Sequence, residues 1–387
     1  MKIIQICAAY KPAYIYGGPT MSVSKLSEEL VKAGEDVIVL ATTANGKAEL
    51  DVPTGIEQIV DGVKVFYFKR LTKDHTHFSP ALFSFLRKLI IAEKKAGRKN
   101  ELIIHIHAWW NLVSIFSCLI AKMYGIKVVL SPRGMLNTYT LSHKNSLSKR
   151  FIHQLLGKYL LKEIAYHATS KQEHNDIFAF TNKSPETIPN FIQLPIQHAV
   201  ETQANEQYQL LFLGRINEIK GLENLFLALS SLTIHWCLTI AGEGDLNYVN
   251  HLKQLATQKN IAEKIKWEGY VNNTQKFDLL ASVDALVLPS YKENFANVII
   301  EALAVGTSVI VSKEAGVAEY VKETNLGWIT SNNPEQLAAT IFQSFKDVQK
   351  RTQIRASAPT IIKQDFDETA LSNKYINMYQ NLLKINP

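Results

Sequence analysis

Short apolar runs of strand length alternate with amphipathic segments of helix length along this chain of 387 residues. In the first half, the strand-like runs are Lys2–Cys7, Asp36–Ala41, Val63–Phe68, Leu102–His107 and Lys127–Leu130. In the second half, they are Gln209–Gly214, Leu238–Ala241, Ile265–Glu268, Ala285–Leu288, Ser308–Val311 and Gly327–Thr330. Buried strands separated by helices are typical of parallel sheets covered on both faces, so we predict an α/β fold.

The length is sufficient for two domains that each bury a core of their own. A polar connector without regular periodicity runs over His198–Gln207. We therefore predict a first domain over residues 1–195 and a second over residues 205–366. A helical pattern over Asp367–Leu383 follows the second domain.

The composition is that of a globular protein, with 47% hydrophobic and 20% charged residues. No apolar run reaches the roughly 18 residues that a membrane span needs, and the first ten residues resemble a strand more than a signal peptide. Cys7, Cys118 and Cys237 are scattered and lack metal-site spacing, which favours buried thiols in a reducing compartment. We predict a cytoplasmic protein.

Positive charge is concentrated in the first half of the chain. Residues 1–200 contain 25 Lys and Arg against 15 Asp and Glu, whereas the remainder contains 17 against 20. Segments 82–99 and 149–162 combine basic residues with an apolar stripe. Such segments bind an anionic membrane surface, here the inner membrane, or else pack on a sheet as ordinary amphipathic helices, and both readings stay open. Nucleic acid is disfavoured because no binding motif accompanies the charge.

Glu293 and Glu301 are the residues most indicative of function. They follow a predicted strand, and we expect a helix with Glu293 at its start. Eight residues of helix separate the two carboxylates by roughly 12 Å. A nucleotide sugar spans that distance, with sugar hydroxyls at one end and ribose hydroxyls at the other. The first-turn amides of Asn294, Phe295 and Ala296 would then face its charged diphosphate.

This Glu-x7-Glu pattern, followed by Ala-Leu-Ala-x-Gly and later by Gly-Val-Ala-Glu, resembles the signature of retaining glycosyltransferases of family 4. The resemblance implies the GT-B fold, in which two Rossmann-like domains face each other across a cleft. It also implies that the last helix, residues 367–387, crosses back to the first domain. Glu293 would bind donor sugar hydroxyls and Glu301 the ribose. The family usually has Gly at position 296, so we expect the methyl of Ala296 to narrow the sugar pocket.

A second motif, Gly214-Arg215-Ile-Asn-Glu-Ile-Lys220-Gly221, links a predicted strand to a helix. Ligands bind at the carboxyl ends of strands in open α/β sheets, and two cations among glycines suit a diphosphate there. The resemblance assigns Arg215 and Lys220 to the donor's phosphates.

The loop after the next predicted strand carries Gly242 and Gly244. It nearly matches the dinucleotide pattern G-x-G-x-x-G, but Asn247 stands where the third glycine belongs. The resemblance instead implies that both glycines, together with Tyr270 two loops on, lie beside the nucleotide. Core packing is the alternative for Tyr270.

In the first domain, His105 and His107 share one face of a predicted strand because side chains alternate along it. The resemblance implies that His107 reaches the donor sugar, and a structural role is the alternative. Zinc is disfavoured because no further ligand has suitable spacing. We predict that Trp109 stacks on the acceptor, with buried packing as the alternative.

Two further elements resemble the family. Gly17 and Gly18 match its glycine pair, where the backbone passes close to the donor, although a simple turn also explains them. Arg133, in Ser-Pro-Arg-Gly, matches a segment of the branch that builds bacterial polysaccharide and lipopolysaccharide. We predict that Arg133 contacts a phosphate or the acceptor, with a surface ion pair as the alternative.

Together these features imply a retaining glycosyltransferase that needs no metal or other cofactor. Its co-substrate would be a nucleoside-diphosphate sugar, and its acceptor a glycan or lipid-linked molecule of cell-surface polysaccharide synthesis. Arg215 and Lys220 would stabilise the departing diphosphate. A nucleotide-sugar epimerase of the same fold is the main alternative. A Rossmann oxidoreductase and a non-catalytic sugar-binding protein are disfavoured.

Overall fold

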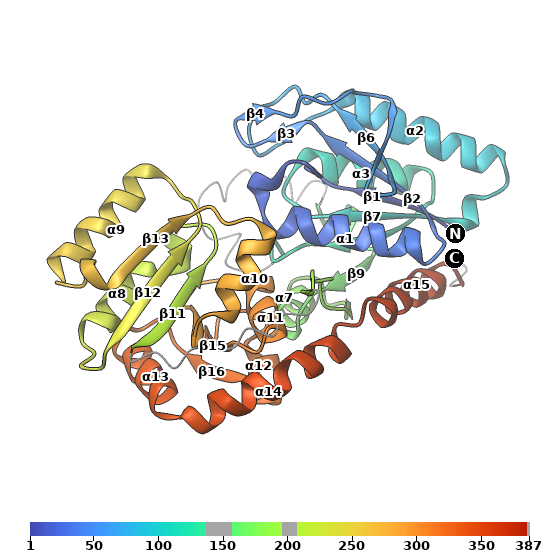
Figure 1. The fold of residues 1–387 in the computed structure, drawn as a ribbon. Coiled ribbons are helices and arrows are strands. Elements are labelled where there is room, and N and C mark those ends of the chain that lie inside the picture. The colour runs from blue at the N-terminus through green and yellow to red at the C-terminus, as the bar shows by residue number, and fades with distance from the viewer. Residues whose placement is uncertain (137–156, 196–206, 385–387) are drawn as a thin grey trace. The chain divides into compact units, whose positions relative to one another are not determined.

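A computed structural model describes residues 1–136, 157–195 and 207–384 of the chain. The chain divides into two units, Met1–Phe191 with Glu368–Pro387, and Ile192–Asp367. Each unit contains one large and mainly parallel sheet with helices packed against it (Figure 1). The predicted connector falls almost entirely outside the described residues.

The first unit has an eight-stranded sheet in the order β10-β9-β8-β7-β1-β2-β6-β5, parallel except for the β5–β6 pair. In chain order the strands are β1 (Lys2–Ile6), β2 (Asp36–Thr42), β5 (Glu57–Val60), β6 (Val63–Phe68), β7 (Leu102–His107), β8 (Lys127–Ser131), β9 (Ala165–Ala168) and β10 (Glu186–Thr187). A separate two-stranded sheet pairs β3 (Ala44–Asn45) with β4 (Ala48–Glu49).

Helices cover both faces of this sheet, because strand side chains alternate between the faces. Ile4 and Ile104 pack with α2 (Pro80–Lys95) and α3 (Leu112–Met123). Ile3 and Ile103 pack on the opposite face with α1 (Gly18–Lys32) and α15 (Glu368–Lys384). The remaining described helical segments are η1 (Tyr14–Tyr16), η2 (Lys99–Glu101), α6 (Lys158–Leu161) and α7 (Lys171–Thr181). The predicted return of the last helix to the first domain is confirmed.

The second unit has a six-stranded parallel sheet in the order β13-β12-β11-β14-β15-β16. The strands are β11 (Tyr208–Leu213), β12 (Trp236–Ala241), β13 (Ile265–Gly269), β14 (Ala285–Leu288), β15 (Ser308–Ser312) and β16 (Gly327–Thr330). The helices are η4 (Glu218–Lys220), α8 (Leu222–Ser230), α9 (Leu246–Gln258), η5 (Ala262–Lys264), α10 (Asn273–Ala281), α11 (Asn297–Ala304), α12 (Ala318–Thr324), α13 (Pro334–Lys346) and α14 (Val348–Asp365).

Every predicted strand is present, and four have the predicted bounds: Val63–Phe68, Leu102–His107, Ala285–Leu288 and Gly327–Thr330. The sequence did not predict the helix α14 or five short strands, β3, β4, β5, β9 and β10. In β5 only Ile59 and Val60 are apolar, so the segment lacks the apolar run of a buried strand, and α14 contains Pro359 in its interior.

Candidate active site

The predicted residues of the second unit gather at the carboxyl edge of its sheet. Strands β11 to β13 are added in one direction and β14 to β16 in the other, so the order reverses between β11 and β14. Open parallel sheets bind ligands at the carboxyl edge beside such a reversal. The loop after β11 carries Gly214, Arg215 and Lys220, and the loop after β14 carries Glu293. The strand order alone therefore brings these residues to one place.

Lys220 and Glu293 form an ion pair at this point. Lys220 ends η4, and its Nζ donates a hydrogen bond to Oε1 of Glu293. The Ser290 hydroxyl donates to the same oxygen at 3.2 Å. Both side chains of the pair are partly buried, with 17% and 18% exposed. Lys220, the predicted phosphate contact, and Glu293, the predicted sugar contact, are thus joined directly by an ion pair. The sequence did not indicate this contact.

Arg215 differs from Lys220 in having no partner among the described residues. Its side chain is exposed and makes no hydrogen bond or ion pair with any residue that the structure describes. A cation that projects from a glycine loop at the carboxyl edge is available to an anionic ligand.

Gly242 and Gly244 allow the loop after β12 to touch the loop after β11. A Cβ atom on Gly242 would lie 1.9 Å from the carbonyl oxygen of Gly214, and one on Gly244 would lie 2.2 Å from that of Ile216. The amide of Ile216 also donates to the carbonyl of Glu243 at 2.7 Å. Contact between two loops therefore explains these glycines, and their contact with a nucleotide stays a prediction.

Glu301 lies on α11 and pairs with Lys276 of α10, with Nζ 2.9 Å from Oε1. The sequence did not single out Lys276. The capping box between Asn272 and Gln275 predicts where its helix begins, but it gives no sign of the partner. Tyr270 follows β13 and is 70% exposed, so the alternative of core packing for Tyr270 is wrong.

The predicted start of the Glu301 helix is wrong. Helix α11 begins at Asn297, so the amides of Asn294, Phe295 and Ala296 lie in the preceding loop instead of the first turn. Glu293 also lies in that loop, and the helical spacing of roughly 12 Å does not apply to it. The cause is the left-handed backbone of Ala296, which interrupts the helix at its N-cap.

Replacing Ala296 by Gly should raise the free energy of unfolding by about 1 kcal/mol, because a φ of 75° is unfavourable for a residue with a Cβ. Chemical denaturation measures the change. Ala356→Gly, at an exposed position inside α14, is the matched control and should lower stability by about the same amount. A loss of stability in both variants would contradict the argument from strain at position 296.

A buried hydrogen-bond network ties α15 to the sheet of the first unit. Nδ1 of His105 lies 2.7 Å from the hydroxyl of Tyr379, and its Nε2 lies 2.6 Å from Oγ of Ser131. The Ser131 oxygen lies 2.7 Å from Nδ1 of His167, and the Tyr375 hydroxyl lies 3.0 Å from Nε2 of the same ring. Strands β7, β8 and β9 therefore share one polar network with the last helix.

His107 lies on the same face as His105, as predicted, with ring centroids 4.2 Å apart. Its Nε2 lies 2.6 Å from Oε1 of Gln5, so Nε2 carries the proton, and Nδ1 accepts from Arg133 at 3.3 Å. Burial, with help from His105 and Arg133, lowers the pKa of His107 well below its usual range. The ring is neutral near pH 7, and its contact with a donor sugar stays a prediction.

Arg133 is held by neutral groups. Its Nη1 donates to Oγ of Ser22 at 3.0 Å and to Oδ1 of Asn190 at 2.8 Å, and its Nε is buried without a partner. The nearby carboxylate of Glu173 instead accepts from the amide of Gly134 at 2.6 Å. Arg133 forms no ion pair with the described residues, so the predicted alternative of a surface ion pair is wrong.

The burial of Trp109 contradicts its predicted stacking on an acceptor. The residue is 1% exposed and packs in the core cluster with Val113 and Leu136. Ala108 has a φ of 70°, which breaks the alternation of β7 and turns the next side chain inward. The alternative of buried packing is correct.

Gly17 immediately precedes α1 and has a φ of 63° with a ψ of −133°, a conformation that favours glycine. No side chain caps the helix that begins at Gly18. The need for this backbone conformation explains Gly17, and a substrate contact by the pair stays a prediction.

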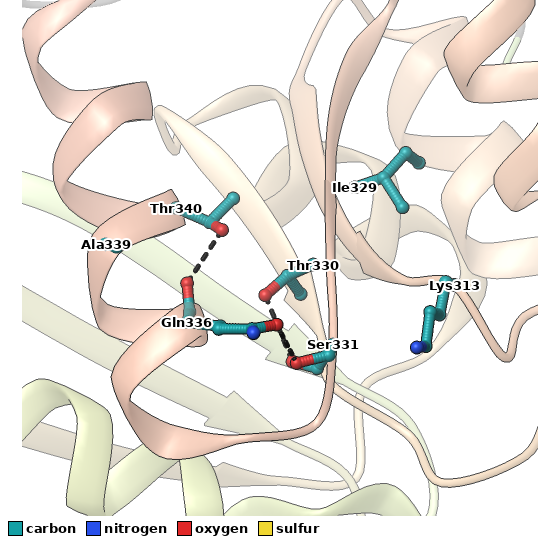
Figure 2. A pocket seen from close by; sticks show the side chains of 7 residues that line it. All are labelled: Lys313, Ile329, Thr330, Ser331, Gln336, Ala339 and Thr340. Atoms are coloured by element: carbon teal, nitrogen blue, oxygen red, sulfur yellow. Dashed lines mark hydrogen bonds between the residues drawn. The ribbon is translucent and has the colours of Figure 1, made fainter.

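A shallow pocket of about 400 Å³ lies where β15 and β16 end, against α13 (Figure 2). The hydroxyl of Ser331 donates to Oε1 of Gln336, and that of Thr340 donates to the Gln336 carbonyl at 2.8 Å. None of the residues predicted from the sequence lines this pocket, and these polar groups satisfy one another.

Of the two interpretations left open for segment 82–99, packing on the sheet is correct for the apolar stripe of α2. Leu82, Leu86 and Ile90 are fully buried against α3 and the sheet, so the stripe belongs to the core. Most of segment 149–162 lies outside the described residues. None of the described helices combines the length and apolar composition needed to cross a bilayer. Contact with an anionic membrane surface and a cytoplasmic location stay predictions.

No group of three or more His, Cys, Asp or Glu side chains within residues 1–136, 157–195 and 207–384 is arranged to hold a metal ion. The proposed independence of metal nevertheless stays a prediction.

Two protein families match the chain in succession. Residues 16–194 match the family described as Glycosyltransferase Family 4, and residues 195–360 match Glycosyl transferases group 1. An uncharacterized glycosyltransferase of Methanocaldococcus jannaschii is 26% identical, with 98% of each chain covered. A glycogen synthase of Mycobacterium tuberculosis is also 26% identical, covering 98% of this chain and 94% of its own.

A shorter match, 28% identical, covers 62% of this chain and 66% of a Campylobacter jejuni protein. That protein is named as an N-acetylgalactosaminyltransferase acting on a diphospho-undecaprenol saccharide. Among solved structures, sucrose-phosphate synthase from Thermosynechococcus elongatus has a TM-score of 0.75 at 20% identity, with 100% of both chains covered. The Anabaena protein HepE in complex with UDP-glucose has a TM-score of 0.71 at 17% identity, covering 98% of this chain and 100% of its own.

Proposed function

We propose that this chain, which is a glycosyltransferase of family 4 with the GT-B fold, moves a sugar from a nucleoside-diphosphate sugar to a glycan or lipid-linked acceptor. The fold predicted from the sequence is confirmed by two Rossmann-like units and by neighbours that cover the whole chain. We further propose that transfer retains the anomeric configuration and requires no metal.

The observation that carries this proposal is the polar group at the reversal between β11 and β14. Lys220 and Glu293 are paired there, and Arg215 in the loop of Lys220 is exposed and has no partner within the described part of the chain. Two cations suit a diphosphate, and a carboxylate accepts hydrogen bonds from sugar hydroxyls. A nucleotide sugar contains both groups in one molecule.

The proposed reaction breaks the bond between the anomeric carbon and the diphosphate oxygen. The acceptor oxygen forms its bond on the same face, and the acceptor proton passes to the departing phosphate. Glu293 is already engaged by Lys220 and Ser290, which favours its binding of hydroxyls over its use as a nucleophile. Arg215 and Lys220 would stabilise the charge that develops on the diphosphate.

The acceptor is proposed to bind the first unit and to carry an anionic group. Arg133 supports this, because its guanidinium lacks a carboxylate partner among the described residues and its buried Nε is unpaired. A buried cation without a counter-ion is unfavourable, and a phosphate would supply the missing charge.

Cell-surface polysaccharide or lipopolysaccharide synthesis is the proposed pathway. Two relatives support it by their names, the Campylobacter jejuni enzyme described above and a lipopolysaccharide core biosynthesis glycosyltransferase of Rhizobium meliloti. None of the relatives named here is an epimerase.

A donor screen tests the function. Purified protein in EDTA is incubated with UDP-, GDP- and dTDP-sugars, and both donor hydrolysis and thermal midpoint are measured. At least one donor should raise the midpoint and be hydrolysed slowly without a metal. Failure of every donor to bind, with and without added magnesium, would overturn the proposal.

Arg215→Ala should weaken binding of the active donor by roughly tenfold or more, because it removes a charged hydrogen-bond donor from the diphosphate. Lys259→Ala is the matched control, since Lys259 is an exposed cation at the end of α9. Equal binding by both variants would remove Arg215 from the diphosphate site.

A further inference from the structure

Three buried polar atoms in loops at the carboxyl edge of the second sheet have no hydrogen-bond partner among the residues that the structure describes. They are Oδ1 of Asn217 after β11, Oε2 of Glu314 after β15 and Nδ2 of Asn332 after β16. Buried polar atoms almost always have a hydrogen-bond partner, and an unpaired one is unfavourable. Several of them at one edge indicate groups that a ligand would satisfy.

Hydrogen bonds connect two of these loops, those of Asn217 and Glu314, to the Lys220–Glu293 pair. The amide of Glu293 donates to the carbonyl of Glu314 at 3.2 Å, and the amide of Lys220 donates to the carbonyl of Asn217 at 3.0 Å. The chain also forms a bridge between Glu293 and Ala315, the residue after Glu314. Glu314 is therefore a backbone neighbour of the carboxylate proposed to bind the donor sugar.

No cation neutralises Glu314 within the described residues. Lys220 is engaged by Glu293, and the adjacent Lys313 lines the pocket of Figure 2 and makes no ion pair with Glu314. An ionised carboxylate can only accept hydrogen bonds, and it repels a diphosphate. The ligand group that suits the unpaired Oε2 of Glu314 is a neutral hydrogen-bond donor such as a hydroxyl.

We propose that Glu314 is a second carboxylate of the donor-sugar subsite and accepts a hydrogen bond from a hydroxyl of the transferred sugar. This inference rests on the proposed function. Glu314 would then help to select the donor sugar, because sugars with different hydroxyl arrangements would form hydrogen bonds of different strength with its Oε2.

Calorimetric titration of wild type and Glu314→Ala tests the proposal. The probes are two pairs of a free nucleotide and its sugar nucleotide, each titrated separately: UDP and UDP-glucose, and GDP and GDP-mannose. The variant should bind the sugar nucleotide roughly tenfold to a hundredfold more weakly, while binding of the free nucleotide changes by less than about twofold. Glu314→Gln should bind the sugar nucleotide with an affinity between those of wild type and Glu314→Ala, because the amide retains one acceptor oxygen. Glu263→Ala, at an exposed position in η5, is the matched control.

The stability of the ligand-free protein separates a binding role from a structural one. Removal of an unpaired buried carboxylate oxygen should leave the thermal midpoint unchanged or raise it. A lowered midpoint, equal sugar-nucleotide binding, or an equal loss for free nucleotide and sugar nucleotide would each overturn the proposal. Absence of binding to all four probes by wild type would instead count against the proposed function itself.

Discussion

Replacement of Lys220 by Met is expected to lower the rate of sugar transfer by roughly 10² to 10³-fold. Its ammonium group is held beside Glu293 at the reversal of the sheet, where we propose that the diphosphate departs. A cation that is already in position stabilises charge that appears only as the bond breaks, so its removal lowers kcat. Turnover at saturating donor and acceptor is the measurement.

The double variant Lys220→Met with Glu293→Gln is the control for structural damage. A single substitution leaves one partly buried charge without its partner and should therefore also destabilise the protein. The double variant removes both charges, so its thermal midpoint should return toward that of wild type while turnover stays low. Recovery of turnover together with stability would show that the pair is only structural.

The sequence was sufficient to locate the candidate site because its residues follow strands. Arg215 and Lys220 come after β11 and Glu293 after β14, and parallel strands bring their carboxyl ends to one edge. The strands themselves were recognisable as apolar runs, since β11 and β14 are buried on both faces. Periodicity therefore predicted the α/β class and its strands, and position after a strand predicted where the candidate residues gather, whereas the GT-B fold and the roles of these residues came from the family resemblance.

The contacts within the site depend on local backbone conformations and on partners distant in sequence, and hydrophobic periodicity reveals neither. Ala296 and Ala108 adopt left-handed backbone conformations that nothing in their residue type indicates. The first delays the start of α11, and the second turns Trp109 into the core. Lys276 pairs with Glu301, and the backbone of Glu314 accepts a hydrogen bond from that of Glu293. Each contact joins residues that are far apart in sequence, so only the fold reveals it.

The stability of the first unit is expected to fall steeply as the pH is lowered from 7 to 5.5. Burial lowers the pKa of His105 and His107 well below the usual range, that of His167 to about 3 and that of His77 to about 4. In the unfolded chain these rings titrate near the ordinary value of about 6.5. Below that pH the unfolded state binds protons that the folded state does not, so stability is complete above about pH 7 and is lost as the pH falls.

Each of these histidines should contribute about 1.4 kcal/mol per pH unit once the pH is below its unfolded pKa. Hydrogen exchange of peptides from β7 and β8, corrected for the intrinsic effect of pH on exchange, measures the loss. Peptides from β12 and β14 are the internal control, because His235 and His251 of the second unit are exposed. His167→Asn should make the pH dependence of the first unit shallower, because it removes one buried group that resists protonation. An equal pH dependence in both units between pH 7 and 5.5 would contradict this account, since the carboxylates that both contain titrate at lower pH.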